Sequence, residues 1–297
     1  MGRTFGRAWH DGVVGLKTLL ERIYQRYNHR ECIGADPLQF AYRFADPADV
    51  EIAAFLAAAL AYGRVEQIQR SVNDLLARMG EGPRRFVWGF SGLSRARLAG
   101  FKHRFTTGDD IGDLLELLRD VLHNHGSLQT FFLQGYESAH PNILLALTRF
   151  CDVLGATYAA RHQGRLSRGL MVLLASPRRG SASKRLHLFL RWMVRDDEVD
   201  LGLWNGIDPT KLIVPIDVHM ARLCRILGFH NRRTISLSTA VQVTEAFAKI
   251  EPADPVRYDF ALSRIGILEG CTGDYRPGCE SCELFGVCLQ RQDWPGS

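Results

Sequence analysis

Residues 271–288 read CTGDYRPGCESCELFGVC and hold four of the seven cysteines in the chain, Cys271, Cys279, Cys282 and Cys288. Their spacing is C-x7-C-x2-C-x5-C, in a segment whose Gly and Pro residues indicate a loop. Four thiols so close together predict a metal site if the compartment keeps them reduced. Four cysteine thiolates hold an iron–sulfur cluster, and structural zinc accepts the same set. One C-x2-C pair flanked by single cysteines favours a 4Fe–4S iron–sulfur cluster, with zinc as the alternative occupant.

Length and composition indicate a soluble globular chain with an extensive core. At 297 residues and 46% hydrophobic content, it should fold as one large or two intimate domains. The longest apolar run, IAAFLAAALAY at 52–62, is shorter than the roughly 20 residues of a membrane helix, so we expect no membrane partner. The N-terminal MGRTFGRAWHDG lacks the apolar core of a secretory signal. We therefore expect a cytoplasmic protein, and we take it to be a monomer.

Apolar residues at three- and four-residue spacing predict helices along most of the chain. The segments are 14–27, 50–79, 111–123, 127–134, 143–157, 184–194, 218–227 and 239–250. Strand patterns are scarce, so the fold class is predicted to be all-α. We expect two helical subdomains: residues 1–49 plus 186–297, which carry the cysteine loop at 271–288, and a central subdomain at 50–185.

Basic residues cluster in the second half of a chain with a net charge of +5. Six of them fall between positions 178 and 195: Arg178, Arg179, Lys184, Arg185, Arg191 and Arg195. Such a cluster is either an ordinary solvated face or the electrostatic footprint of a polyanion such as nucleic acid.

The cysteine loop resembles the segment that closes endonuclease III and the adenine glycosylases, which belong to the helix-hairpin-helix DNA glycosylase superfamily. The resemblance includes the preceding helical stretch YDFALSRIGILEG at 258–270 and the RPGC at the second cysteine. The superfamily usually has six residues between its first two cysteines, whereas this chain has seven. The resemblance implies an all-helical fold, a groove between two subdomains, a 4Fe–4S cluster and double-stranded DNA as partner.

A second segment, VPIDVHMARL at 214–223 followed by Leu227 and Gly228, resembles the superfamily segment V-D-T-H-V-x-R-x. The resemblance matches Asp217 to the catalytic aspartate. From the residues alone, an Asp between a Pro and an amphipathic run is a helix cap held near free backbone amides. The order of the two signals, aspartate first and cysteine loop about fifty residues later, is that of endonuclease III.

Bifunctional members of the superfamily also use a lysine that forms a Schiff base with the sugar. Lys184 is the candidate, because it opens the helical run KRLHLFLRWMV after the loop SPRRGSAS. The superfamily hairpin signature L-P-G-x-G-x-x-T-A is absent, and Gly180 alone stands nearby. The separation of thirty-three residues from Asp217 is similar to that of the archaeal 8-oxoguanine glycosylase branch. A solvated lysine at a helix start is the alternative for Lys184, and Lys211 is the alternative nucleophile.

Other residues are candidates for holding DNA. Backbone amides of Gly180 and Ser181 lie at a helix start that can bind a phosphate, with Arg178, Arg179 and Arg185 supplying charge beside it. The stretch AALAYGRVEQIQ at 58–69 places Tyr62 and Arg64 where the superfamily helix ends near its groove, so either is a candidate wedge into the base stack.

The leading interpretation is a DNA base-excision glycosylase, with or without associated lyase activity. One alternative is a non-catalytic iron–sulfur protein that binds nucleic acid with a degenerate site. Another is a zinc-stabilised helical enzyme acting on a small molecule. The runs GSASKRLHLFLRWMVR at 180–195 and LGLWNGIDPTKLIVPIDVH at 201–219 resemble an uncharacterised bacterial family at the edge of the superfamily. That resemblance implies the fold and the cluster more firmly than the activity.

Overall fold

The computed structural model describes residues 4–80, 82–268 and 270–289, which are mainly helical, as predicted. The long helices are α1 (Thr4–Tyr27), α2 (Pro47–Ala59), α3 (Val65–Met79), α6 (Gly108–His125), α8 (Leu144–Arg161), α10 (Lys184–Val194), α11 (Val218–Ile226), α12 (Leu237–Ala248) and α13 (Asp259–Leu268). Shorter helices are α4 (Pro83–Trp88), α5 (Gly92–Ala96), α7 (Leu128–Leu133) and α9 (Arg168–Leu173). Two short strands, β1 (Lys102–His103) and β2 (Thr106–Thr107), form an antiparallel hairpin.

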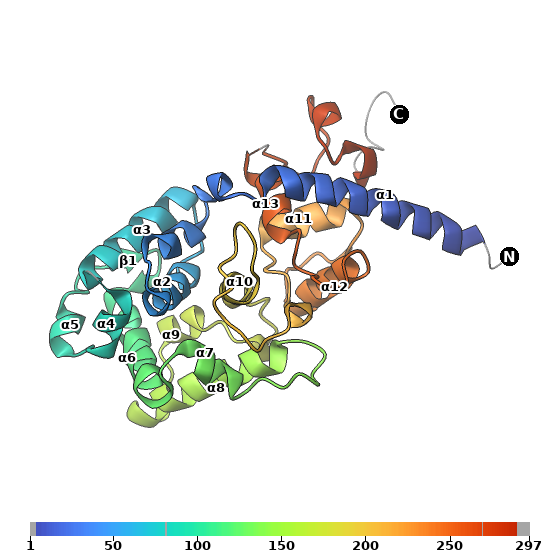
Figure 1. The fold of residues 1–297 in the computed structure, drawn as a ribbon. Helices are drawn as coiled ribbons and strands as arrows, with labels where there is room; N and C mark the ends of the chain where they lie inside the picture. The colour runs from blue at the N-terminus through green and yellow to red at the C-terminus, as the bar shows by residue number, and fades with distance from the viewer. Residues whose placement is uncertain (1–3, 81, 269, 290–297) are drawn as a thin grey trace.

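Helix α10 lies at the centre of the molecule (Figure 1). Helices α2 to α6 are gathered on one side of it, and α1, α11, α12 and α13 on the other. Helix α10 packs on α2, while α13 packs on both α1 and α11. The division into residues 1–49 plus 186–297 and residues 50–185 remains a prediction.

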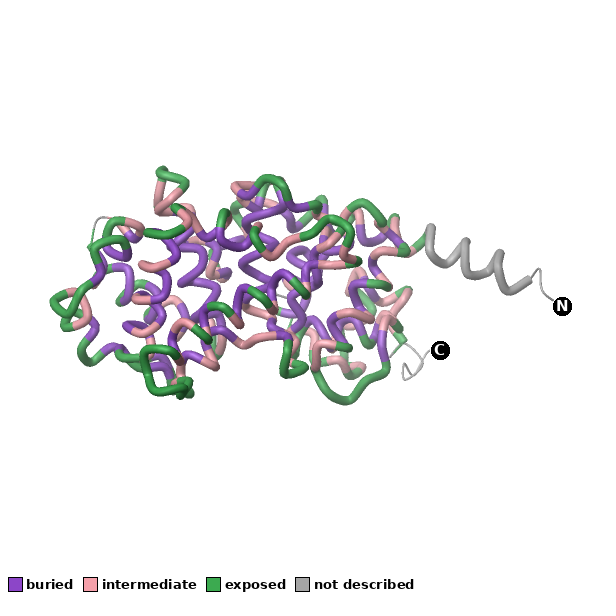
Figure 2. Tube along the Cα trace, turned by 90° about the horizontal axis from the view of Figure 1, so that it is seen from below, coloured by how far each residue is buried: buried purple, intermediate pink, exposed green. Residues whose placement is uncertain are grey.

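Helix α2, which packs on α10, is buried along most of its length. Its residues from Val50 to Ala59 are all buried, and Figure 2 shows such buried backbone running through the interior of the molecule. A helix that is apolar all round must be covered on every side, and the many alanines let its neighbours approach closely. The single helix predicted over 50–79 is wrong, because the chain leaves the helix after Ala59 and Gly63 adopts a φ of +101°. Among the described residues, no helix combines the length and apolarity needed to cross a membrane.

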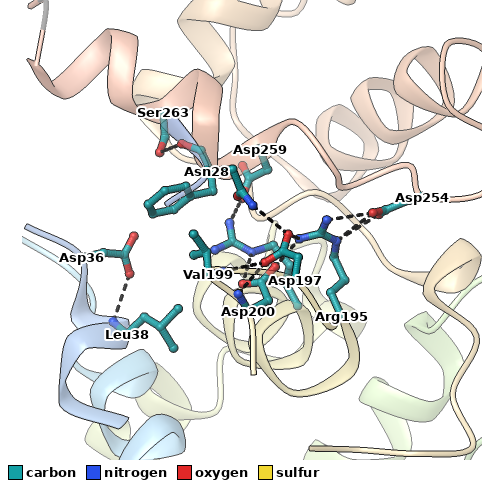
Figure 3. Close-up of polar contacts among 12 residues, drawn as sticks. Asn28, Asp36, Leu38, Arg195, Asp197, Val199, Asp200, Asp254, Asp259 and Ser263 are labelled. Atoms are coloured by element: carbon teal, nitrogen blue, oxygen red, sulfur yellow. Dashed lines mark hydrogen bonds and ion pairs between the residues drawn. The ribbon is translucent and has the colours of Figure 1, made fainter. Parts of the chain in front are cut away.

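A buried ionic network joins α10 to the segments around it (Figure 3). Arg195 donates to Asp254 at 2.9 Å and contacts Asp197 at 2.9 Å and Asp200. Arg191 contacts Asp200 at 3.2 Å. The side chains of both arginines are at most 4% exposed. The basic cluster read from the sequence therefore does not form one surface, since two of its members neutralise carboxylates in the core.

Candidate functional site

Lys184 and Asp217, which are distant in sequence, meet at the starts of two helices. Lys184 is the first residue of α10, and Asp217 caps the N-terminus of α11. The Lys184 Nζ lies 3.7 Å from the Asp217 Oδ2. The other carboxylate oxygen, Oδ1, accepts the backbone N–H groups of His219 at 3.0 Å and Met220 at 2.9 Å. The cap thus fixes the aspartate and leaves one oxygen facing the lysine.

A tight hairpin between α9 and α10 sets the position of Lys184. After a 3-10 turn at Pro177–Arg179, Gly180 adopts a φ of +73° and Ser183 a φ of +45°. A left-handed conformation is unfavourable for serine and persists only where surrounding contacts hold it. Here the buried Ser183 hydroxyl donates to the Ala175 carbonyl at 2.6 Å, and the Gly180 carbonyl accepts from the backbone N–H of Leu237 at 2.9 Å. These contacts therefore fix the position of the first residue of α10, Lys184.

A cavity of about 460 Å³ opens beside the Lys184–Asp217 pair. Its wall combines the segment between α2 and α3, the start of α3, the first two turns of α10, the start of α11 and one side of α13. Its lining includes Tyr62, Gly63, Lys184, Arg185, Leu188, Arg191, Asp217, His219, Asp259 and Arg264. A volume of this size lies within the range that small ligands occupy in proteins.

A second carboxylate, Asp259, lines the same cavity. It is buried and pairs with the guanidinium of Arg191. Burial raises the pKa of Asp259 to about 6, and the negative charge of Asp217 acts in the same direction, while Arg191 and Lys184 oppose the rise. The Nη2 of Arg191 is buried and has no hydrogen-bond partner among the described residues. No sequence signal marked Asp259, which read as an ordinary residue at the start of a helix.

Arg185 forms part of the cavity wall and also donates hydrogen bonds to main-chain carbonyls near the ends of two helices. Its Nη1 donates to the Ala59 carbonyl at 2.6 Å and its Nη2 donates to the Val172 carbonyl. The guanidinium also lies 4.9 Å from the ring centre of Tyr62. Burial lowers the pKa of Arg185. Two of its nitrogens thus donate to main-chain oxygens near the ends of α2 and α9. Fewer of its N–H groups are therefore available to bind a phosphate than we expected from the sequence.

The other residues expected to hold a phosphate lie in the hairpin between α9 and α10 and do not line the cavity beside Lys184 and Asp217. Arg178 donates to Asp152 at 2.9 Å and remains 67% exposed, and Arg179 Nη1 lies 3.2 Å from the Met171 sulfur. Both arginines line a separate cavity of about 410 Å³ at α8 and α9. The Ser181 hydroxyl accepts from the Ser183 N–H at 3.1 Å. Their role toward DNA stays a prediction.

The two candidate wedge residues take different positions. Tyr62 is half-buried and lines the cavity, whereas Arg64 is exposed at the N-cap of α3. The ring of Tyr62 is covered in part by Phe105, a residue from the β1–β2 hairpin, at 5.2 Å between ring centres and with the planes 22° apart. The sequence gave no reason to choose Phe105, since a two-residue strand carries too little pattern to recognise.

The four cysteines of the loop at 271–288 line one small cavity of about 40 Å³, together with apolar residues that include Ile226, Leu284 and Phe285. All four are half-buried. Among the described residues, no group of three or more His, Cys, Asp or Glu side chains meets the geometry for a metal ion. Four sulfur donors around one apolar space nevertheless fit the donor set of an iron–sulfur cluster.

The cysteine loop is attached to α11, the helix that Asp217 caps. The Arg222 side chain donates to the Cys271 carbonyl at 2.9 Å. Gly273 adopts a φ of +89°, and a Cβ at this position would lie only 2.6 Å from the Arg222 side chain. The close approach therefore requires glycine. Away from the loop, Cys151 and Cys224 are buried in the core.

Comparison with curated proteins and with solved structures found no match. The sequence model of one family, described as a protein of unknown function (DUF2400), matches residues 36–268. The matched region includes Lys184, Asp217 and the hairpin between α9 and α10, and it ends before the cysteine loop. It covers well over half of the chain, so the protein belongs to the DUF2400 family.

Proposed function

We propose that the protein is a DNA base-excision glycosylase with an associated lyase activity, and that Lys184 and Asp217 carry the reaction. The observation that carries the proposal is the 3.7 Å approach of the Lys184 amine to the free Oδ2 of Asp217 beside a cavity of about 460 Å³. An amine and a carboxylate at this separation can both contact one sugar placed beside them in the cavity, as nucleophilic catalysis with charge stabilisation requires.

Each residue has a defined part in the reaction. The Lys184 ammonium gives up a proton to water, and the resulting amine attacks C1′ of the extruded nucleotide. The base leaves with the electrons of the N-glycosidic bond and takes up a proton from water. The Asp217 carboxylate stabilises the positive charge that develops on the sugar. Its hydrogen bonds from the backbone N–H groups of His219 and Met220 hold it in position during this step.

The lyase step follows from the bond to Lys184. The amine nitrogen loses a proton, the C1′–O4′ bond breaks with its electrons going to the ring oxygen, and an iminium forms. Loss of a proton from C2′ then expels the 3′ phosphate by β-elimination. Since an enzyme cannot reach C1′ inside a stacked duplex, the nucleotide must first rotate out into the cavity.

We further propose that Cys271, Cys279, Cys282 and Cys288 hold a 4Fe–4S cluster. The cavity that these side chains share and its apolar surroundings support the assignment. When bound, the cluster would cross-link the loop and stabilise its attachment to α11 through Arg222. Brown colour and visible absorbance after anaerobic purification, lost in Cys282→Ser, would distinguish it from zinc.

Borohydride trapping tests the catalytic proposal. The duplexes carry 8-oxoguanine, uracil, thymine glycol or an abasic site, and the proteins are wild type, Lys184→Ala, Asp217→Asn and Lys211→Ala. We expect a covalent complex with wild type that is lost in Lys184→Ala. Lys211 is the matched control because its amine donates to the His140 carbonyl at 2.9 Å and is not part of the cavity wall.

The outcomes separate the possible activities. Base release without trapping, abolished in Asp217→Asn, would replace the lyase with a monofunctional glycosylase. Tight binding without any base release would overturn the catalytic proposal in favour of a non-catalytic nucleic-acid-binding protein. Trapping that persists in Lys184→Ala and disappears in Lys211→Ala would move the nucleophile.

A further inference from the structure

The β1–β2 hairpin presents one aromatic ring to solvent beside the cavity. Its two strands pair Lys102 with Thr107 and His103 with Thr106, so only Arg104 and Phe105 form the turn. Phe105 is 61% exposed, among the most exposed large apolar residues in the described part of the chain. Phe105 therefore exposes much of its apolar surface to solvent at the tip of a tight turn.

The base of the hairpin is firmly held. The Tyr62 hydroxyl donates to the His103 carbonyl at 3.0 Å and lies 2.7 Å from the Thr106 hydroxyl. The fully buried His103 places its ring nitrogens 2.8 Å from the Ser71 hydroxyl and 3.0 Å from the Tyr62 carbonyl. The tip is therefore carried on a rigid support rather than on a mobile loop.

The turn holds a conformation that its residue type disfavours. Arg104 has a φ of +55°, a position that glycine or asparagine occupies at lower cost in a two-residue hairpin. The Arg104 side chain packs over Gly63, where an added Cβ would lie 3.0 Å from the Arg104 Cδ. A strained conformation kept by surrounding contacts is characteristic of functional sites, and here it fixes the direction of Phe105.

The ring also connects to the cavity by direct contact. Phe105 stacks on Tyr62, and Tyr62 lines the cavity and contacts the guanidinium of Arg185. Around the tip, the side chains of Lys102, Arg104 and Arg64 are exposed and basic. The apolar ring can stack on a nucleic-acid base, and the basic side chains around it can contact the phosphates on either side of the base stack.

We propose that Phe105 is the wedge that enters the DNA base stack where the target nucleotide leaves it, with Tyr62 as its support. This inference rests on the proposed function, since a wedge has a purpose only if a nucleotide is rotated into the cavity. Apolar side chains inserted at base steps open the stack in this way in other DNA-binding proteins. The wedge is thus assigned to Phe105 rather than to Tyr62 or Arg64.

The test measures binding to duplexes that contain tetrahydrofuran, a stable abasic-site analogue, opposite 2-aminopurine. Wild type should bind this duplex more tightly than an undamaged one and change the 2-aminopurine fluorescence. Phe105→Ala should lose about 5- to 150-fold in affinity for the tetrahydrofuran duplex, the range of one lost base–aromatic stack, and should lose the fluorescence change. Its affinity for undamaged duplex, which depends on phosphate contacts, should remain nearly unchanged.

Two variants complete the experiment. Phe105→Trp should restore both the affinity and the fluorescence change, because it restores the stacking surface. Leu93→Ala is the matched control, since Leu93 on α5 is 86% exposed and does not line the cavity. If wild type prefers the tetrahydrofuran duplex and Phe105→Ala does so equally, the wedge is refuted and the proposed function stands. If wild type binds no duplex, the proposed function falls and the wedge with it.

Discussion

Replacing the buried histidine of α10 should make the protein less sensitive to acid. His187 is 1% exposed, and neither ring nitrogen has a hydrogen-bond partner among the described residues. Burial lowers the pKa of His187 to about 3, whereas an unfolded chain has an ordinary histidine pKa of about 6.5. The unfolded state therefore binds a proton as pH falls through 6.5 while the folded state does not, so this residue lowers stability progressively below that pH.

The magnitude follows from the two pKa values. At pH 7 the histidine is mostly neutral in both states, but at pH 5 the unfolded state gains about 2 kcal/mol from protonation. His187→Leu removes this proton-linked loss. It also removes two unpaired nitrogens from the core, which adds a pH-independent gain of about 1–3 kcal/mol. The benefit of the substitution should therefore be about 2 kcal/mol larger at pH 5 than at pH 7.

Urea unfolding of wild type and His187→Leu under anaerobic conditions, at both pH values, measures the difference between the two proteins, in which any cofactor contribution cancels. His230→Leu is the matched control. Both ring nitrogens of the buried His230 are engaged, at 2.7 Å from the Ala221 carbonyl and 3.2 Å from the Arg232 N–H, so this substitution should destabilise. An equal effect of His187→Leu at the two pH values, or a His187 NMR signal that titrates near pH 6.5, would refute the reasoning.

Three further results are expected. Glu51→Ala should lower the free energy of unfolding by about 3–5 kcal/mol, because it leaves the Trp204 indole and two backbone amides at the start of α7 without an acceptor; Glu51→Gln should cost less in the same urea titration. Arg195→Met should lower the free energy of unfolding by about 3–5 kcal/mol, because the buried Asp200 carboxylate loses one of its positively charged partners. A change near zero would contradict this. Asp217→Asn should slow base release by about a hundredfold or more in single-turnover assays while preserving the fold, since asparagine caps helices as well as aspartate.

The sequence was sufficient to predict the helical class and the positions of Lys184 and Asp217 at the starts of two helices. Both residues stand at helix starts, and helix starts carry recognisable local signals: Ser and Gly before α10, and Pro followed by Asp before α11. Their approach to 3.7 Å is a tertiary contact that no local pattern contains. The long apolar run around Phe55 was also correctly assigned to a buried helix, because a run that is apolar all round has no other place in a globular protein.

Other features depend on contacts that no local pattern contains. The arginines at 191 and 195 looked like their neighbours at 178 and 179, and only the packing of α10 against the carboxylates at 200, 254 and 259 separates buried from exposed charge. The break after Ala59 was missed because Gly63 alone is weak punctuation within a helical pattern. The β1–β2 hairpin was missed because its turn, Arg104 and Phe105, lacks the glycine or asparagine that usually marks one.

The geometry of the cavity depends on one face of α10. Lys184, Leu188 and Arg191 stand at positions i, i+4 and i+7 of the helix and all line the cavity, because residues at this spacing share a face. Arg191, two turns beyond Lys184, pairs with Asp259 at the first turn of α13, and α13 packs on α11, whose cap is Asp217. Lys184 on α10 and Asp217 on α11 are thus linked through the buried Arg191–Asp259 ion pair and the packing of α13 on α11. Arg191 and Asp259 also line the cavity, and the Arg191 Nη2 has no hydrogen-bond partner among the described residues. The buried Arg191–Asp259 ion pair and the candidate catalytic pair therefore share helix α10 and the wall of one cavity.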